Sequence, residues 1–234
     1  MGHVLNQIND FNKRGFSGQP NQPFKDLISM DQTHSNKVVF LSRQESRLVY
    51  QSINDMNYSI ENEASYPILD DSFAHPNATP FTSLRQSVIV PSDAVITKEF
   101  DVILSVKTAD CVPIIMIADP YIAVIHSGRV GTITHITTHV CRTLKELQSA
   151  SPIIWFGPHS CVMCYEIDSD THTHFDLLNE NLSQVKAVFG DDIDYDISPY
   201  CTQCHHDTLF SYRMGDHINR NVFYLEKDST SFSS

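Results

Sequence analysis

The chain has 234 residues, of which 41% are hydrophobic, and this length and composition are typical of one compact globular domain. Sixteen basic and 28 acidic side chains give a formal net charge of −12, which disfavours nucleic-acid and membrane partners because both present negative charge. The longest uninterrupted apolar stretch, Val112 to Ala118, is far shorter than the ~20 residues that a membrane-spanning helix needs.

The N-terminal residues lack the basic and then apolar pattern of a signal peptide, so we expect a cytoplasmic protein. In that compartment cysteines serve as thiols or metal ligands more often than as disulfides. All six cysteines follow residue 110, which places the expected chemistry in the second half of the chain. We expect one domain over residues 1–234, with 1–30 and 228–234 poorly ordered.

The first predicted elements, in chain order, are strands separated by a long loop. Val38 to Leu41 is a short β-branched and apolar run, typical of a strand. The proline-containing stretch 66–91 is expected to be mainly loop. Val102, Leu104 and Val106 then alternate as one face of a second strand.

Two apolar runs, 113–118 and 121–125, are predicted to form a hairpin that turns at Asp119-Pro120. That turn pairs Pro113 with His126 and makes Cys111 a diagonal neighbour of His126, about 7 Å away between backbones. A thiolate and an imidazole at this separation can share one metal ion or act as nucleophile and base. The alternative is a buried cysteine beside a core histidine with no chemical role.

A helix and a further strand follow the hairpin. Gly131-Thr132 is the expected helix start, and apolar residues recur at helical spacing in Ile133, Ile136, Val140, Leu144 and Leu147. The helix should end before Pro152, where the strand Ile153 to Phe156 begins. Strand, hairpin, helix and strand together predict an α+β fold, a single domain of β-sheets with flanking helices.

Several short motifs resemble the bacterial YfiH family, also called the laccase-domain or polyphenol-oxidase-like family. They occur in the family's order over about residues 30 to 220. The matching stretches are Gln32-Thr33-His34, Asp93-Ala94-Val95-Ile96-Thr97, Lys107-Thr108-Ala109-Asp110-Cys111-Val112-Pro113, Ala123-Val124-Ile125-His126-Ser127-Gly128 with Gly131-Thr132, Gly157-Pro158 with Cys164-Tyr165-Glu166, Cys201-Thr202 and Phe210-Ser211-Tyr212-Arg213.

The resemblance implies a YfiH-like fold and a mononuclear zinc site formed by His34, Cys111 and His126. Three protein ligands leave a fourth position on Zn²⁺ for water or substrate, which suits catalysis, with Cys111 and His126 as the catalytic residues. Two imidazoles and a thiolate also suit copper. Family members are implied to cleave purine nucleosides with phosphate and to deaminate adenosine, so the expected partners are small molecules, a purine nucleoside and phosphate.

Cleavage of a nucleoside with phosphate needs an anion site beside the ribose. The turn from Gly128 to Thr132, including Arg129 and Gly131, is the predicted site because backbone N–H groups at a helix start attract anions. Arg213 is a second candidate partner for the phosphate charge.

The chain departs from the family motifs near this turn. Arg129-Val130 stands where the family has Trp-Arg, Met214 replaces a second arginine, and Ser35 follows His34 in place of glycine. Two alternatives to the nucleoside enzyme therefore remain. One is a Cys-His hydrolase or amidase of the kind that edits cell-wall precursors, and the other is a zinc-binding family member that has lost catalysis.

Two CxxC pairs, Cys161/Cys164 and Cys201/Cys204, are separated by 36 residues. Such pairs can form a structural zinc site when the fold brings them together. The alternative is that Cys164 and Cys201 belong to the family motifs and the other two are incidental thiols.

Overall fold

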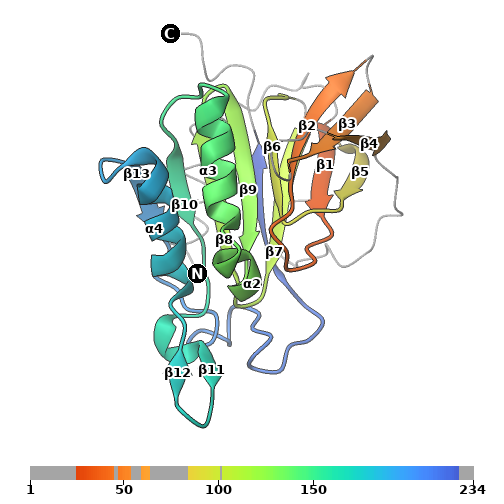
Figure 1. Ribbon diagram of the computed structural model, residues 1–234. Coiled ribbons are helices and arrows are strands. Elements are labelled where there is room, and N and C mark those ends of the chain that lie inside the picture. The colour runs from red at the N-terminus through yellow and green to blue at the C-terminus, as the bar shows by residue number, and fades with distance from the viewer. Residues whose placement is uncertain (1–24, 45–46, 54–58, 64–83, 101, 227–234) are drawn as a thin grey trace.

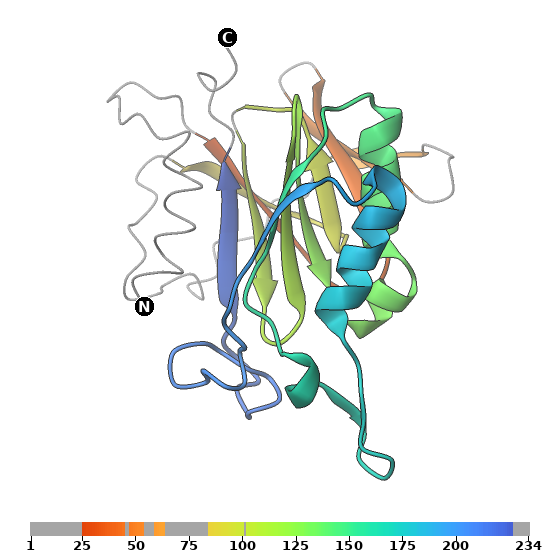
Figure 2. The same ribbon diagram turned by 90° about the vertical axis from the view of Figure 1, so that its left-hand side faces the viewer.

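The fold stacks three layers, namely helices, a larger β-sheet and a smaller β-sheet (Figures 1 and 2). The structure is a computed structural model that describes residues 25–44, 47–53, 59–63, 84–100 and 102–226. Sheets with helices on one face are the predicted α+β class, which is confirmed.

The first half of the chain forms strands β1 (Lys25–Met30), β2 (Val38–Gln44), β3 (Arg47–Ser52), β4 (Ser59–Glu63), β5 (Leu84–Val90), β6 (Ala94–Thr97), β7 (Val102–Thr108), β8 (Val112–Ala118) and β9 (Tyr121–Ser127). The second half forms helices α2 (Arg129–Ile133), α3 (Ile136–Glu146) and α4 (Leu177–Phe189), the 3₁₀ turn η2 (Val162–Cys164) and strands β10 (Ile153–Phe156), β11 (Glu166–Asp168), β12 (Thr173–His174), β13 (Asp194–Ile197) and β14 (Asn221–Glu226).

Within the described residues, the larger sheet has eight strands in the order β13-β10-β8-β9-β6-β2-β3-β4, and the smaller has four in the order β14-β7-β1-β5. Successive side chains of a strand point to opposite faces, and on the central strands β8 and β9 of the larger sheet both faces are buried. On β8, Ile114 packs toward α3 and α4, whereas Ile115 packs toward the smaller sheet. Two apolar layers therefore flank the larger sheet.

Helices α3 and α4 lie side by side on the outer face of the larger sheet (Figure 1). None of the helices in the described ranges is both long and apolar enough to cross a membrane.

The predicted hairpin is confirmed, and so are the strands expected at 38–41, 102–106 and 153–156. β8 and β9 pair antiparallel around the Asp119-Pro120 turn, and Pro113 lies opposite His126. The other three predicted strands are β2, β7 and β10. A two-residue turn between two apolar runs fixes both the pairing and its register.

Two regions predicted to lack regular structure contain strands. β1 occupies part of the segment 1–30 that was expected to be poorly ordered, and β5 occupies the end of the expected loop 66–91. β1 is the central parallel strand between β5 and β7, and its polar Ser29 is buried against Ser105, with 2.9 Å between the hydroxyl oxygens. Residues 1–24, 64–83 and 227–234 lie outside the described part, so those portions of the predictions are untested.

The predicted helix after the hairpin is divided into two. Gly131 and Thr132 lie inside the short helix α2, and α3 starts only after His135, whose φ is 63°. The expected start was wrong because the Thr132 hydroxyl donates back to the Gly128 carbonyl oxygen at 2.9 Å, so it does not cap a following turn. As predicted, the helical segment ends before Pro152.

Candidate metal centre

Three connections pass from the smaller sheet to the larger one, and each carries a residue of the candidate site. The β1–β2 connection carries His34, the β5–β6 connection carries Asp93, and the β7–β8 connection carries Cys111. Because β5 and β7 both run parallel to β1, these connections leave the smaller sheet at the same edge (Figure 1). His126 reaches this edge from the end of β9.

The structure brings the three expected metal ligands together. The ligand atoms of His34, Cys111 and His126 all lie within 4.8 Å of one another. The two imidazole rings meet edge to face, with 4.8 Å between their centroids. His126 is buried and His34 is exposed, so the cluster is accessible from the His34 side.

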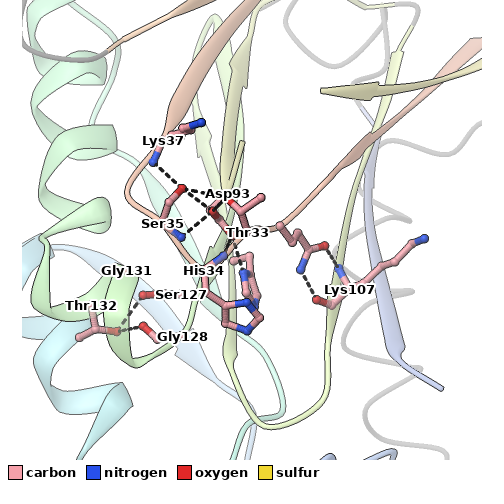
Figure 3. A network of polar contacts seen from close by, with 12 residues as sticks. Thr33, His34, Ser35, Lys37, Asp93, Lys107, Ser127, Gly128, Gly131 and Thr132 are labelled. Atoms are coloured by element: carbon pink, nitrogen blue, oxygen red, sulfur yellow. Dashed lines mark hydrogen bonds and ion pairs between the residues drawn. The ribbon is translucent and has the colours of Figure 1, made fainter. Parts of the chain in front are cut away.

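Asp93 is the buried carboxylate behind this cluster (Figure 3). One of its oxygens lies 2.8 Å from His126 Nδ1 and accepts the His34 backbone N–H at 3.1 Å. The other oxygen accepts the backbone N–H of Ser35 at 2.8 Å and its hydroxyl at 2.7 Å. Asp93 therefore orients one imidazole and fixes the loop that carries the other. Although burial opposes ionisation, these hydrogen bonds from His126 and Ser35 lower the pKa of Asp93.

The backbone at the cluster is strained. Gln32, His34 and Asp110 adopt left-handed conformations with φ values of 52°, 57° and 94°. Non-glycine residues hold such conformations only where their surroundings fix them, and these positions concentrate at functional sites. The Gln32 amide bonds to the backbone of Lys107 on β7, with the Lys107 N–H 2.9 Å from Gln32 Oε1, and so holds the start of the His34 loop (Figure 3).

Gly128 passes directly beside the metal ligands. A Cβ atom on this residue would lie 2.9 Å from Cys111 Sγ and 3.1 Å from His34 Cδ2. Both distances are shorter than ordinary carbon contacts, so any side chain here would displace two ligands. The site thus requires glycine at this position for packing.

Cys111 and His126 shift each other's ionisation. Burial alone would raise the pKa of Cys111, but hydrogen bonds from His126 and His34 lower it to about 6. Burial alone would lower the pKa of His126, but its hydrogen bonds to Asp93 and Cys111 raise it to about 9. A thiolate is therefore favoured at neutral pH, which is the form that binds metals and the form that acts as a nucleophile.

The donor set fits a metal ion held by three protein ligands. Two imidazoles and a thiolate are ligands that zinc accepts, and a buried carboxylate behind a histidine is the usual second partner of such a ligand. Ligand bonds of about 2.0 to 2.3 Å separate the donors of one ion by about 3.3 to 3.8 Å. The donor atoms of this cluster lie within 4.8 Å of one another, so they are near enough to share one ion.

The predicted phosphate residues fall into two groups. Gly128, Gly131 and Thr132 are buried. The Thr132 hydroxyl donates to the Gly128 carbonyl oxygen and lies 2.9 Å from the Ser127 hydroxyl (Figure 3). In contrast, the side chains of Arg129 and Arg213 are exposed. Of the five predicted residues, the two arginines are thus the ones that present charge at the surface.

Tyr165 stacks against Arg213 and responds electrostatically to Cys111. The Arg213 guanidinium stacks over the Tyr165 ring, 4.1 Å from its centroid, and donates to the Glu166 carbonyl at 2.7 Å. Burial raises the pKa of Tyr165, as does the negative charge of Cys111, while Arg213 and Arg129 oppose this. The phenol therefore lies within electrostatic reach of the thiolate and of both arginines.

Sequence reasoning did not assign roles to Asp93, Asp110 or Tyr165. All three stand inside the motifs that carry the family resemblance, next to residues that were assigned, and this was the available signal. Their contacts depend on segments far apart in the chain, as in the 2.7 Å bond from Thr202 Oγ1 to Asp110.

Comparison with known proteins shows the family to which this chain belongs. Residues 9–191 match the family model described as multi-copper polyphenol oxidoreductase laccase. The chain belongs to this family. The laccase-domain fold is also seen in the crystal structure of the Bacillus licheniformis hypothetical protein YfiH. The two align with a TM-score of 0.60 and 15% identity over 97% of this chain and 82% of that one.

Two curated relatives in sequence are named as enzymes of purine nucleosides. A purine nucleoside phosphorylase of Bacteroides thetaiotaomicron is 25% identical over 178 residues, which is 64% of each chain. The adenosine deaminase RL5, from an unknown prokaryotic organism, is 27% identical over 160 residues, covering 55% of this chain and 59% of the relative. The chain thus matches less than two thirds of the length of these relatives.

Proposed function

We propose that this laccase-domain protein is a zinc-dependent enzyme that cleaves purine nucleosides with phosphate. The observation that carries the proposal is the cluster of His34, Cys111 and His126, backed by Asp93 and open to solvent at His34. The named activities of the two curated relatives supply the substrate class. Zinc, rather than copper, suits this reaction because it supplies Lewis acidity without redox chemistry.

The protein's own residues have distinct tasks in this proposal. His34, Cys111 and His126 would hold the ion, which when bound supplies a Lewis acid toward a substrate oxygen or a water molecule. Asp93 forms a 2.8 Å hydrogen bond with His126 Nδ1. The other ring nitrogen, Nε2, is therefore the one that would bind the ion. Gly128 leaves the space between two ligands free of a side chain.

Arg129 and Arg213 would bind phosphate on the Tyr165 side of the cluster. In phosphorolysis a phosphate oxygen forms a bond to the ribose C1′ while the bond from C1′ to the purine nitrogen breaks, and the leaving base gains a proton. Two guanidinium groups near one phenol favour an anion at this position. The two guanidinium groups provide local positive charge in a chain whose net charge is −12.

The Cys111–His126 pair favours a second candidate function, a Cys-His hydrolase or amidase. A thiolate paired with an imidazolium is the activated nucleophile of such enzymes, and the pKa values of about 6 and 9 describe that ion pair. The two functions differ in what the thiolate binds, because a thiolate that holds zinc is not free to attack a substrate.

The test is product analysis with purified, metal-quantified full-length protein. Adenosine, inosine and guanosine are incubated with and without phosphate, and free base and ammonia are measured. We expect base release that requires phosphate, its loss in His126→Ala, and at least about a tenfold loss of kcat/KM in Arg213→Ala. Arg142→Ala is the matched control because Arg142 is an exposed arginine on α3.

Each other outcome identifies an alternative. Ammonia from adenosine without base release would assign deamination by water. Product formation that appears only after zinc is removed would support the Cys-His hydrolase. Bound zinc with neither product from any purine nucleoside would contradict the proposal and indicate a family member without catalysis, consistent with Arg129-Val130 in place of the family's Trp-Arg.

A further inference from the structure

The two CxxC pairs, 36 residues apart in sequence, meet in space. Cys161 and Cys164 lie between β10 and β11, and Cys201 and Cys204 lie between β13 and β14. All four Sγ atoms lie within 4.8 Å of one another, and those of Cys164 and Cys204 are 3.6 Å apart. In a tetrahedral zinc site with Zn–S bonds of about 2.3 Å, the sulfur atoms are about 3.8 Å apart. The cluster therefore has the dimensions of a four-thiolate site.

A backbone turn follows the first cysteine of each pair. In the first pair, the 3₁₀ turn η2 follows Cys161, whose carbonyl accepts the N–H of Cys164 at 3.0 Å. In the second pair, the Cys201 carbonyl accepts the N–H of His205 at 3.0 Å. A tight turn after the first cysteine is what a CxxC pair needs to bind one ion through both sulfurs.

Backbone N–H groups also point at the sulfur of Cys201. The Cys201 Sγ atom lies 3.2 Å from the backbone nitrogen of Cys161 and 3.5 Å from the backbone nitrogen of Cys204. A thiolate accepts such bonds, and outer hydrogen bonds of this kind orient the ligands of metal sites. One of these donors belongs to the other pair, so the hydrogen bond also links the two turns.

We propose that Cys161, Cys164, Cys201 and Cys204 bind one zinc ion in a closed, structural site distinct from the candidate catalytic centre. Four cysteines fill the tetrahedral coordination of zinc and leave no position for a substrate, in contrast to the three-ligand cluster at His126. An all-sulfur donor set selects zinc or iron over harder cations such as magnesium or calcium.

The position of this cluster gives it a role in holding two loops together. The Gln203 side chain, inside the second pair, donates to the Cys164 carbonyl at 2.8 Å, and the Thr202 N–H donates to the His159 carbonyl at 3.0 Å. The loops that contain the two pairs also carry Tyr165 and Arg213, so an ion here would fix both residues relative to each other.

The same loops are tied to the segment that carries Cys111. The Asp110 carboxylate accepts Thr202 Oγ1 at 2.7 Å, Ser211 Oγ at 2.7 Å and the Arg213 N–H at 2.8 Å. Its backbone carbonyl accepts the Ser160 N–H at 3.0 Å. The four-cysteine site would therefore stabilise the wall of the candidate catalytic centre without taking part in its chemistry.

The test is the zinc content per chain of full-length protein purified without chelators. We expect two zinc ions for the native chain, one for the double variant Cys161→Ser/Cys204→Ser and one for His126→Ala, because the two clusters share no residue. Cys141→Ser is the matched control, since Cys141 is a buried thiol on α3 outside both clusters, and it should keep both ions.

A second measurement covers the case in which the double serine variant does not fold. His126→Ala, which retains all four cysteines, is reconstituted with Co²⁺, and we expect the intense sulfur-to-cobalt absorption and tetrahedral visible bands of a four-thiolate site. A native chain with a single zinc that His126→Ala loses would overturn the proposal. So would bound iron, or a count of fewer than six thiols after metal removal and denaturation, which would indicate a disulfide.

Discussion

Asp93 is the residue on which the geometry of the candidate metal centre depends. Its two oxygens contact the His126 ring, the His34 backbone and both donors of Ser35. It is fully buried, so these bonds are shielded from water. Its function is to position the two histidines, and it is not a metal ligand in the cluster.

We therefore expect Asp93→Asn to weaken zinc binding at the three-ligand cluster by about tenfold to a hundredfold. Asparagine keeps the size of the side chain but loses the negative charge that favours the metal-binding orientation of His126. Competition with a chromophoric chelator measures the affinity. Asp191→Asn, at an exposed aspartate after α4, is the control, and equal affinities in the two variants would contradict the positioning role.

The paired ionisation of Cys111 and His126 predicts a reactive thiol in zinc-free protein. Because the pKa of Cys111 is lowered to about 6, its alkylation by iodoacetamide should rise with pH through about 6 and level off above neutral pH. Cys141, whose pKa is raised to about 12 by burial, should remain unmodified in the same sample. Peptide mass spectrometry separates the two sites.

His126→Ala removes the partner that favours the thiolate, so the midpoint of the Cys111 profile should move up toward the ordinary value of about 8.5. The midpoint, and not the maximal rate, is the relevant quantity, because a thiolate of lower pKa is also a weaker nucleophile. A midpoint near 8.5 already in the native chain would contradict the ion pair.

At the scale of elements, a buried polar network joins α2, α3 and α4 to the end of β9. Asn181 on α4 is its centre and is fully buried. Its Oδ1 accepts from Ser127 at 2.8 Å and from Thr137 at 2.6 Å, and its Nδ2 donates to Thr132 Oγ1 at 3.0 Å. The amide thus satisfies three hydroxyl groups that would otherwise be buried with fewer partners.

Replacing Asn181 by Ala should lower the free energy of unfolding by about 2 kcal/mol or more, because several buried polar groups lose a partner at once. Asn179→Ala on the exposed side of the same helix should change it by less than about 0.5 kcal/mol. Urea unfolding at constant m value compares the two variants. Similar values for both would show that the network does not stabilise the fold.

Some elements of the fold could be predicted from the sequence and others could not. The β8–β9 hairpin was predictable with its register because a two-residue turn leaves one pairing, and that pairing brought Cys111 and His126 together. The break between α2 and α3 was not, since it lies at His135, a non-glycine residue whose backbone is left-handed with a φ of 63°. The four-cysteine cluster could be suspected from its two spacings, but its assembly depends on loops whose relative position only the whole fold determines.

At the scale of the whole molecule, both candidate metal clusters lie where separate parts of the fold must be held together. The three-ligand cluster joins connections that cross between the two sheets, and the four-cysteine cluster joins the loops after β10 and β13. His34 was found only through the family resemblance. Neither composition nor periodicity indicates that three connections from separate parts of the chain end at one sheet edge.

This arrangement predicts which parts of the chain loosen when metal is removed. A ligand at a hundredfold excess over its dissociation constant stabilises the bound form by about 2.7 kcal/mol, which is about a hundredfold in an opening equilibrium. Chelation should therefore speed amide hydrogen exchange in connections 31–37, 91–93 and 109–111 and in the cysteine loops 157–165 and 198–213. The central strands β8 and β9, buried on both faces, should keep their protection.

The two clusters can be separated in the same experiment. His126→Ala should loosen the three crossing connections while the cysteine loops stay protected, and Cys161→Ser/Cys204→Ser should loosen the cysteine loops first. Asp110 links both regions through Thr202 and Ser211, so some spread from the cysteine loops to 109–111 is expected. Exchange that is unchanged by chelation, or that rises uniformly over β8 and β9, would contradict a role for these clusters in holding the loops.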